Sequence, residues 1–190
     1  MWYVVQTNTG EEEQIKQIIE KLKSLDKDAE CFTPIYEGVK RSGGNNRVYL
    51  AMLFPGYIFI DSSHPEKIMD AEKKMTEFVK LLGVEKDEEG IRITPVTDRD
   101  RYFIESLTDE NHIMHLSLVR VNENHKIDKV VGPLEKFWDK IVKIEYRKRR
   151  AIIETEMFGK KHRIRFGLWG YEDPKMDWFE DKNGLERLTG

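Results

Sequence analysis

The sequence has very little cysteine and no long apolar run. Cys31 is the only cysteine among 190 residues, which excludes an intramolecular disulfide framework and a cysteine-based zinc finger. No apolar run approaches the roughly 20 residues that a membrane-spanning helix needs. The N-terminus, MWYVVQTNTGEEE, lacks the basic start of a secretory signal. We therefore expect a cytoplasmic protein that makes no membrane contact.

The sequence also lacks any clear motif for catalysis, a cofactor or a metal. His112 and His115 have the spacing of two ligands on one helical turn, but no third ligand follows, so we interpret them as solvated linker histidines. Gly43 and Gly44 are not followed by the Lys-Ser/Thr pair that a phosphate-binding loop requires. We expect a protein that is not an enzyme and that holds no cofactor or metal.

Charge, in contrast, is abundant and unevenly distributed, and charged residues make up 35% of the chain. Residues 1–112 carry 15 Lys and Arg against 22 Asp and Glu, a net charge of −7. Residues 113–170 carry 14 against 7, a net charge of +7, and the last 20 residues carry 3 against 6. This asymmetry indicates two modules with different partners, and the basic module is the candidate for binding a polyanion.

The first hundred residues predict an α+β domain. A strand at 2–6 precedes a helix at 11–25, in which Ile15, Ile18 and Leu22 repeat at helical spacing. The other expected elements are strands at 31–39 and 47–61 around a loop at 40–46, a helix from 65 to about 74 or 78, a helix end or short strand at 79–84, a strand at 91–94 and a helix at 98–107. This order predicts a split βαβ fold, with helices on one face of a four-stranded antiparallel sheet.

The second half predicts a small β-barrel after a linker. Residues 110–126 are polar and are predicted to form the linker, although 116–121 is alternatively a strand. Short β runs then follow at 127–131, 140–146, 151–157 and 162–168. Short strands at such even spacing are typical of a small barrel.

Two strings resemble a known family. WYVVQTNTGEEEQI and FPGYIFID resemble the signature segments of the NusG N-terminal (NGN) domain, and VVGPLEKFWDKIVKIEYRKRRAIIETEMFGKKHRIRFGL is similar to the KOW motif. The chain thus resembles a NusG-family transcription factor, and its basic third turn resembles the specialised LoaP-type antiterminators. The resemblance implies an NGN domain at 1–109, a linker at 110–126, an SH3-like KOW barrel at 127–170 and an acidic tail of unassigned role at 171–190.

The aromatic residues around FPGY allow two interpretations. Phe54, Pro55 and Tyr57, with Trp2 nearby, line an apolar depression that receives the tip of a partner helix, or they are core residues of a strand pair with the proline at an edge or bulge. The resemblance favours the first and implies that the partner is the clamp helices of RNA polymerase. The predicted polymerase-binding residues are therefore Trp2, Phe54, Pro55 and Tyr57.

Two basic clusters, at 147–150 and 160–163, are either solvated turns or an RNA-binding surface. Alternate turns of an antiparallel barrel lie at the same end, so we expect both clusters to form one patch. Tyr146, Phe158 and Phe166 are candidates for stacking on unpaired bases. The predicted RNA-binding residues are Lys143, Tyr146, Arg147, Lys148, Arg149, Arg150, Phe158, Lys160, Lys161 and Arg163.

The resemblance implies a monomeric antitermination or processive elongation factor that docks on RNA polymerase through the NGN domain and binds a hairpin of the nascent RNA through the KOW domain. One alternative is a general NusG-type elongation or pausing factor whose KOW domain binds a ribosomal or termination protein, with Phe158 at the contact. An unrelated alternative is an accessory subunit of a nucleic-acid enzyme, which predicts dependence on a divalent metal.

Overall fold

The computed structural model describes residues 1–8, 12–75, 78–88, 90–124 and 126–174. It divides into two compact units. Unit 1 comprises Met1–Pro34 and Phe54–Glu105, and unit 2 comprises Ile35–Leu53 and the chain from Ser106 onwards. Within these described ranges, no helix combines the length and the apolar character needed to cross a membrane.

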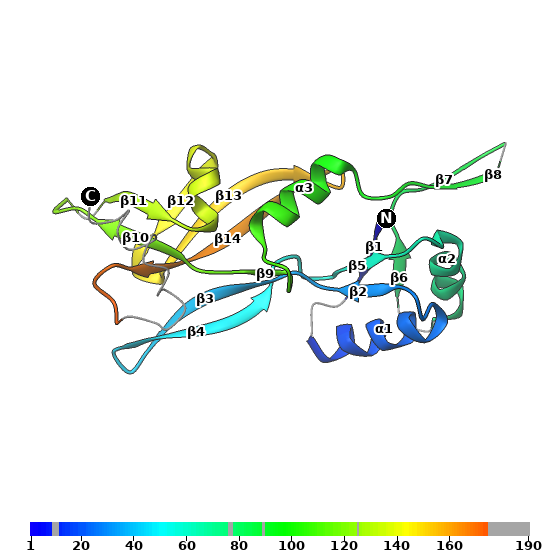
Figure 1. Cartoon of the computed structure of the whole chain (residues 1–190), viewed down its shortest axis with the longest axis horizontal. Coiled ribbons are helices and arrows are strands. Elements are labelled where there is room, and N and C mark those ends of the chain that lie inside the picture. The colour runs from blue at the N-terminus through cyan, green and yellow to red at the C-terminus, as the bar shows by residue number, and fades with distance from the viewer. Residues whose placement is uncertain (9–11, 76–77, 89, 125, 175–190) are drawn as a thin grey trace. The chain divides into compact units, whose positions relative to one another are not determined.

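Unit 1 is built on a four-stranded antiparallel sheet with the order β2-β5-β1-β6. Its strands are β1 (Trp2–Thr7), β2 (Glu30–Phe32), β5 (Tyr57–Asp61) and β6 (Val79–Leu81). The helices α1 (Glu12–Leu25) and α2 (Pro65–Lys74) contact β2 and β6 respectively (Figure 1). The side chains of Ile15, Ile18 and Leu22 on α1 are buried, as their helical spacing predicts. The predicted four-stranded antiparallel sheet is confirmed, but the predicted strand at 31–39 is divided, because β2 ends at Phe32 and the residues from Ile35 onwards belong to another sheet.

The FPGY segment is a turn rather than a proline within a strand. The amide of Tyr57 donates to the carbonyl oxygen of Phe54 at 3.1 Å, and Gly56 has a φ of 81°. Pro55 therefore occupies the first central position of a tight turn whose second central position needs a positive φ, which suits Pro followed by Gly. The edge-strand interpretation of Pro55 is wrong, because the long predicted strand at 47–61 is broken here.

The rest of unit 1 includes a hairpin, of which the sequence analysis predicted the second strand, at 91–94, but missed the first. The strands β7 (Val84–Asp87) and β8 (Gly90–Ile93) pair antiparallel. The predicted helix at 98–107 is present as α3 (Asp98–Leu107). The predicted helix starting at residue 65 ends at Lys74, and the segment that follows forms β6, so the short-strand alternative at 79–84 is confirmed.

Unit 2 begins with a hairpin of β3 (Ile35–Ser42) and β4 (Asn45–Met52). Gly43 and Gly44 form its two-residue loop with φ values of 60° and 84°. Positive φ at both central residues is the geometry that joins two twisted strands most tightly, and glycine adopts it without steric cost. The loop predicted at 40–46 is therefore much shorter, because the strands run on to its two glycines.

The C-terminal part of unit 2 is a five-stranded sheet with the order β11-β10-β14-β13-β12. Its elements are β10 (Ser117–Val121), β11 (Ile127–Val131), β12 (Ile141–Glu145), β13 (Arg150–Met157) and β14 (Lys160–Gly170), with 3-10 helices η1 (Pro133–Lys140) and η2 (Tyr146–Lys148). All four predicted strands are confirmed. The interpretation of 110–126 as a linker needs correction, because β9 (Ile113–Met114) and β10 lie within it and β10 joins the sheet.

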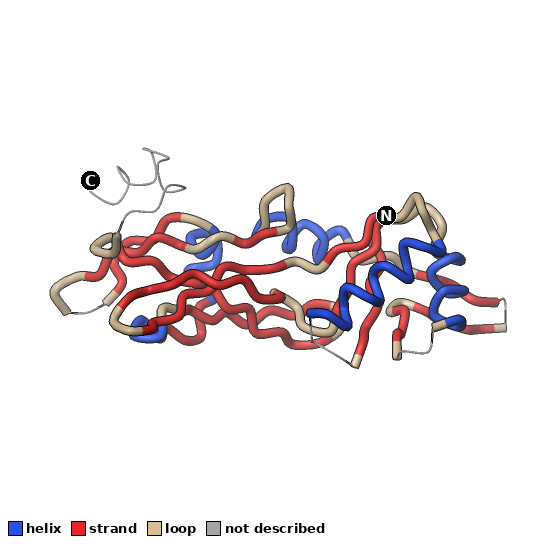
Figure 2. Tube along the Cα trace, turned by 90° about the horizontal axis from the view of Figure 1, so that it is seen from below, coloured by secondary structure: helices blue, strands red, loops and turns tan. Residues whose placement is uncertain are grey.

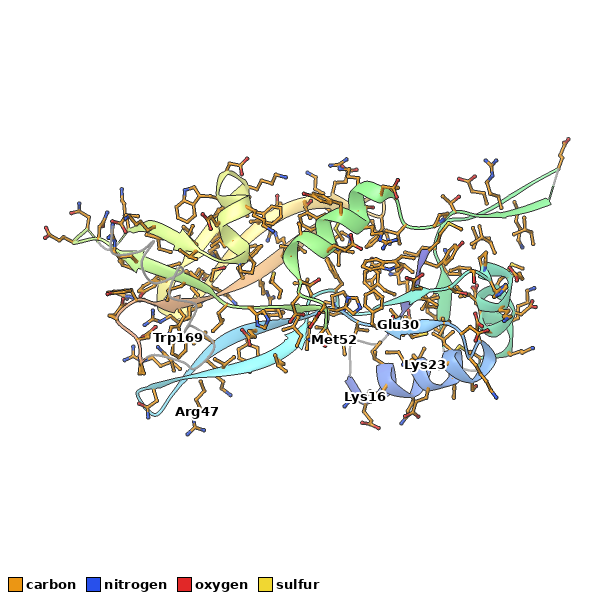
Figure 3. All side chains as sticks on the ribbon, in the orientation of Figure 1. Lys16, Lys23, Glu30, Arg47, Met52 and Trp169 are labelled. Atoms are coloured by element: carbon orange, nitrogen blue, oxygen red, sulfur yellow. The ribbon has the colours of Figure 1, made fainter. Side chains whose placement is uncertain are left out.

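The β3–β4 hairpin packs against this C-terminal sheet within unit 2 (Figures 1 and 2). A Cβ atom at Gly167 on β14 would overlap the carbonyl oxygen of Glu37 on β3, so the glycine permits the two backbones to approach. Trp169, labelled in Figure 3, belongs to a buried cluster with Val39 and Leu116. The hairpin is therefore anchored to the sheet by apolar packing.

Candidate functional site

The four predicted polymerase-binding residues lie in or beside an aromatic cluster of unit 1. The ring centroids of Trp2 and Phe32 are 5.0 Å apart with their edges facing, and Phe32 stacks on Phe59 at 5.5 Å. Phe54 adds a tilted contact with Phe59 at 6.0 Å. The guanidinium carbon of Arg101 lies 4.9 Å from the centroid of the Trp2 ring. The sequence analysis missed Phe32, Phe59 and Arg101 as members of this cluster.

Only one of these four residues is exposed. Trp2, Phe54 and Tyr57 are 6%, 3% and 9% exposed, while Pro55 is exposed at the turn. Burial also raises the pKa of the Tyr57 hydroxyl. The geometry is that of a packed aromatic cluster with a proline at its edge, so a partner that contacts the rings must first uncover them.

The two basic clusters lie at opposite ends of β13. The segment 147–150 joins β12 to β13, and the segment 158–161 joins β13 to β14. These turns are consecutive, and consecutive turns of an antiparallel sheet alternate between its ends. The eight residues of β13 therefore separate the clusters by about 25 Å. The expectation of one convergent patch is wrong.

Most of the charge in the first cluster is already paired. Glu145 contacts Lys148 at 3.0 Å, Arg150 at 2.6 Å and Lys143 at 3.5 Å. Hydrogen bonds from Lys148 and Arg150 lower the pKa of the Glu145 carboxyl to about 2, so the carboxylate is charged throughout the physiological range. Arg147 is exposed and has no ion pair within the described residues.

Arg149 is fixed by the first residues of the acidic tail. Its guanidinium donates to Asp173 at 2.8 Å and lies 4.4 Å from the centroid of the Tyr146 ring. The Tyr146 hydroxyl in turn donates to Glu172. Burial, followed by this hydrogen bond, raises the pKa of Tyr146 to about 12. Arg149 and Tyr146 therefore stabilise the tail, and the Tyr146 ring is partly covered by an arginine.

The second cluster is simpler and more exposed. Phe158 and Gly159 form its turn with φ values of 51° and 68°. Lys160 and Lys161 are exposed and have no ion pair within the described residues, while Arg163 pairs with Glu154 at 2.8 Å. Phe158 is half-buried, with its ring centroid 6.0 Å from that of His162.

Phe166 cannot serve as a stacking platform. Its side chain is fully buried and packs against Phe137, with ring centroids 6.2 Å apart. The prediction that Phe166 stacks on bases is wrong, because the residue points into the core of the sheet.

The interpretation of the two histidines as solvated linker residues also needs correction for His115. Its Nε2 lies 3.0 Å from Asp109 and its Nδ1 lies 3.3 Å from Glu37. Burial raises the pKa of Asp109, but hydrogen bonds from the Ile113 amide and from His115 outweigh it and lower the pKa. Within the described ranges, no group of three His, Cys, Asp or Glu is placed to hold a metal ion.

Sequence reasoning missed the residues that adjoin the first cluster in space. A cavity of about 380 Å³ lies between the β3–β4 hairpin and the 147–150 segment. The hairpin contributes Tyr36, Tyr49, Lys40 and Arg41, and β14 contributes Arg165. The basic Lys40 and Arg41 were visible in the loop string KRSGGNN, but nothing in the sequence joined them to residues more than one hundred positions away.

Comparison with known families decides what kind of protein this is. A family model described as "Transcription termination factor nusG" matches residues 1–105, more than half of the chain. The chain belongs to the NusG family.

The curated relatives match this NusG-family chain over most of their length and carry one description. The "Transcription termination/antitermination protein NusG" of Thermus thermophilus is 27% identical over 173 residues, which cover 84% of this chain and 91% of the relative. Proteins with the same name from Borreliella burgdorferi and Haemophilus influenzae are 28% and 21% identical, and the matches cover 84% of this chain and 90% and 86% of the relatives. These matches identify a transcription termination/antitermination factor. The family match at 1–105 and the β-rich C-terminal region are consistent with an NGN domain plus a KOW region, although residues 35–53 of the matched segment belong to unit 2.

Proposed function

We propose that this protein is a specialised, LoaP-type antitermination or processive elongation factor. It docks on RNA polymerase through the aromatic cluster of its NGN domain and binds a hairpin of the nascent RNA through its basic C-terminal region. It acts as an accessory factor, with no catalytic step of its own. The observation that carries the RNA half is the net charge of +7 in residues 113–170 beside −7 in residues 1–112.

The unpaired cations divide the proposed RNA surface into two parts. Arg147 lies at one end of β13, and Lys160 and Lys161 lie at the other. Each releases counterions when it meets a phosphate, whereas a cation already paired with a carboxylate contributes less. Lys143, Lys148 and Arg150 share Glu145, so they support the surface more weakly than their number suggests.

Titration of the full chain with a labelled RNA stem-loop tests the RNA half. We expect affinity to fall steeply between about 50 mM and about 200 mM salt. Arg147→Gln should reduce the slope of log affinity against log salt by about one if the Arg147 end of β13 contacts a phosphate. Lys160→Gln should do the same if the opposite end contacts a phosphate. A wild-type chain that binds no RNA at the lower salt, but retains a ribosomal or termination protein, would favour the general elongation-factor alternative.

Retention of purified bacterial RNA polymerase by the immobilised full chain tests the other half. Replacing a buried ring such as Phe54 by a charged residue is uninformative, because a charge buried without a partner unfolds the domain. Pro55→Glu instead adds a charge at the exposed edge of the cluster and should abolish retention. Asn124→Glu adds the same charge at another exposed turn and should retain polymerase as the wild type does. Equal retention by both variants would contradict docking at this cluster.

A further inference from the structure

The cavity between the β3–β4 hairpin and the 147–150 segment is lined mainly by cations and aromatic rings. Among the described residues that line it, seven are Lys or Arg and none is Asp or Glu. Its volume of about 380 Å³ lies in the range of small-ligand sites. The cavity therefore has the charge and size for a compact anion that carries a flat apolar group.

Four of these cations have no ion pair within the described part of the chain. They are Lys40, Arg41, Arg147 and Arg165. All four are exposed, so a phosphate can reach them from solvent. Arg149 and Arg150 also line the cavity, but Asp173 and Glu145 already hold them in place. The unpaired cations come from three separate parts of the sequence, and the packing of the hairpin on β14 brings them together.

The aromatic side of the cavity is preformed. Tyr36 is buried and meets Tyr49 edge to face, with ring centroids 6.3 Å apart, while Tyr49 remains 42% exposed. A Cβ atom at Gly38, directly across from Tyr49 in the hairpin, would overlap the Tyr49 ring, so the glycine lets that ring lie over the strand. Burial and a hydrogen bond with Tyr36 raise the pKa of Tyr49 to about 12, which keeps its hydroxyl neutral beside an anion.

We propose that this cavity binds one nucleotide of an unpaired RNA segment, with the phosphate on Arg41, Arg147 and Arg165 and the base on the Tyr49 ring. The proposal rests on the RNA binding proposed above, and it adds the β3–β4 hairpin to the RNA site. Bases of a duplex stack on one another, so only an unpaired base can lie on a side chain.

Anisotropy titration of the full chain with a labelled single-stranded RNA of about ten nucleotides tests the proposal. Tyr49→Ala should weaken binding about tenfold, because stacking on one aromatic ring contributes about 1–3 kcal/mol per base. Tyr49→Phe should bind like the wild type. Arg41→Gln should weaken binding several-fold and reduce the salt slope by about one.

Arg47→Gln is the matched control for Arg41→Gln. Both arginines are exposed on the same hairpin, but Arg47 does not line the cavity and points away from the hairpin (Figure 3). Arg47→Gln should therefore leave affinity close to that of the wild type. If Arg41→Gln, Tyr49→Ala and Arg47→Gln all bind the single strand as tightly as the wild type, RNA binding stands and the cavity is not its nucleotide site.

Fluorine NMR of the chain labelled with 3-fluorotyrosine tests nucleotide binding in the cavity independently of binding to an RNA hairpin. Adenosine 5′-monophosphate should shift the Tyr49 resonance, assigned with Tyr49→Phe, and inorganic phosphate should shift it less because it brings no base. A Tyr49 resonance that stays unmoved at saturating RNA overturns the proposal. If the chain binds no RNA but the mononucleotide shifts the Tyr49 resonance, the cavity binds a free nucleotide. That result would contradict both RNA binding in this cavity and the proposed RNA binding of the C-terminal region.

Discussion

The two basic turns at the ends of β13 look alike in the sequence and differ in their surroundings. The turn at 147–150 is enclosed by Glu145, by Asp173 and by the β3–β4 hairpin. Beside the turn at 158–161, the described residues form the Arg163–Glu154 pair, and Lys160 and Lys161 are exposed. A run of basic residues therefore measures how much charge a turn carries, whereas the neighbouring carboxylates determine how much of it remains available to a partner.

The largest expected difference between the two turns comes from adding one methyl group beside each of them. Gly167 pairs with Arg150 in the sheet, and a methyl group there would overlap the Glu37 carbonyl oxygen and the Leu116 side chain. We expect Gly167→Ala to lower the free energy of unfolding by about 3 kcal/mol, because neither neighbour can move aside freely. Urea denaturation measures this difference.

Gly159→Ala is the counterpart at the open turn. Nothing lies within 4 Å of the added methyl group, and only the positive φ of 68° is unfavourable for alanine. The expected loss is about 1 kcal/mol. If both variants lose the same amount, the hairpin is not packed tightly on β14.

Removing the carboxylates of Asp173 and Glu172 tests how the acidic tail stabilises the turn at 147–150, and we expect a smaller effect on stability. Asp173 accepts hydrogen bonds from the Gly170 amide at 2.7 Å, from Arg149 at 2.8 Å and from Asn46 at 2.9 Å. Asp173→Ala should therefore cost about 2 kcal/mol of stability, because it removes the carboxylate nearest to the largely buried Arg149 guanidinium. Glu172→Ala, at a side chain that is 58% exposed, should cost less than about 1 kcal/mol by the same urea measurement. A reversed order would show that Arg149 is held mainly by Glu172.

Lowering the pH should change the stability of the two turns differently, and this is the smallest effect that we expect. The pKa of Glu145 is lowered to about 2, so its stabilising contribution is complete above the ordinary glutamate pKa of about 4.3 and is lost as the pH falls towards 2. The melting temperature of the wild type should therefore fall more between pH 5 and pH 3 than that of Glu145→Gln. Glu154→Gln, which removes an exposed pair, should show the same pH dependence as the wild type. Identical pH profiles for all three would contradict the role of Glu145.

Local sequence signals were sufficient to predict a helix or strand whose formation depends mainly on its own residues. The pattern of Ile15, Ile18 and Leu22 identified α1, and the β runs of the second half identified β11 to β14 within one or two residues. The FPGY segment was harder, because its proline and glycine predict a turn as readily as an irregular edge strand. Its aromatic residues are buried against Phe32 and Phe59, and Phe32 lies outside the strings that carry the family resemblance.

The amino-acid sequence by itself determined the family, the α+β fold class and the separation of acidic and basic halves. Each of these depends on local signals, namely short motifs, hydrophobic spacing and the charge of continuous segments. The tertiary structure decided which charges are available. It placed two consecutive basic turns at opposite ends of β13, and it paired Arg149 and Arg150 with carboxylates from different segments. It also brought Lys40, Arg41 and Tyr49 to a cavity beside Arg147 and Arg165. Contacts between residues so far apart in the chain depend on how strands pack, and no local pattern encodes them.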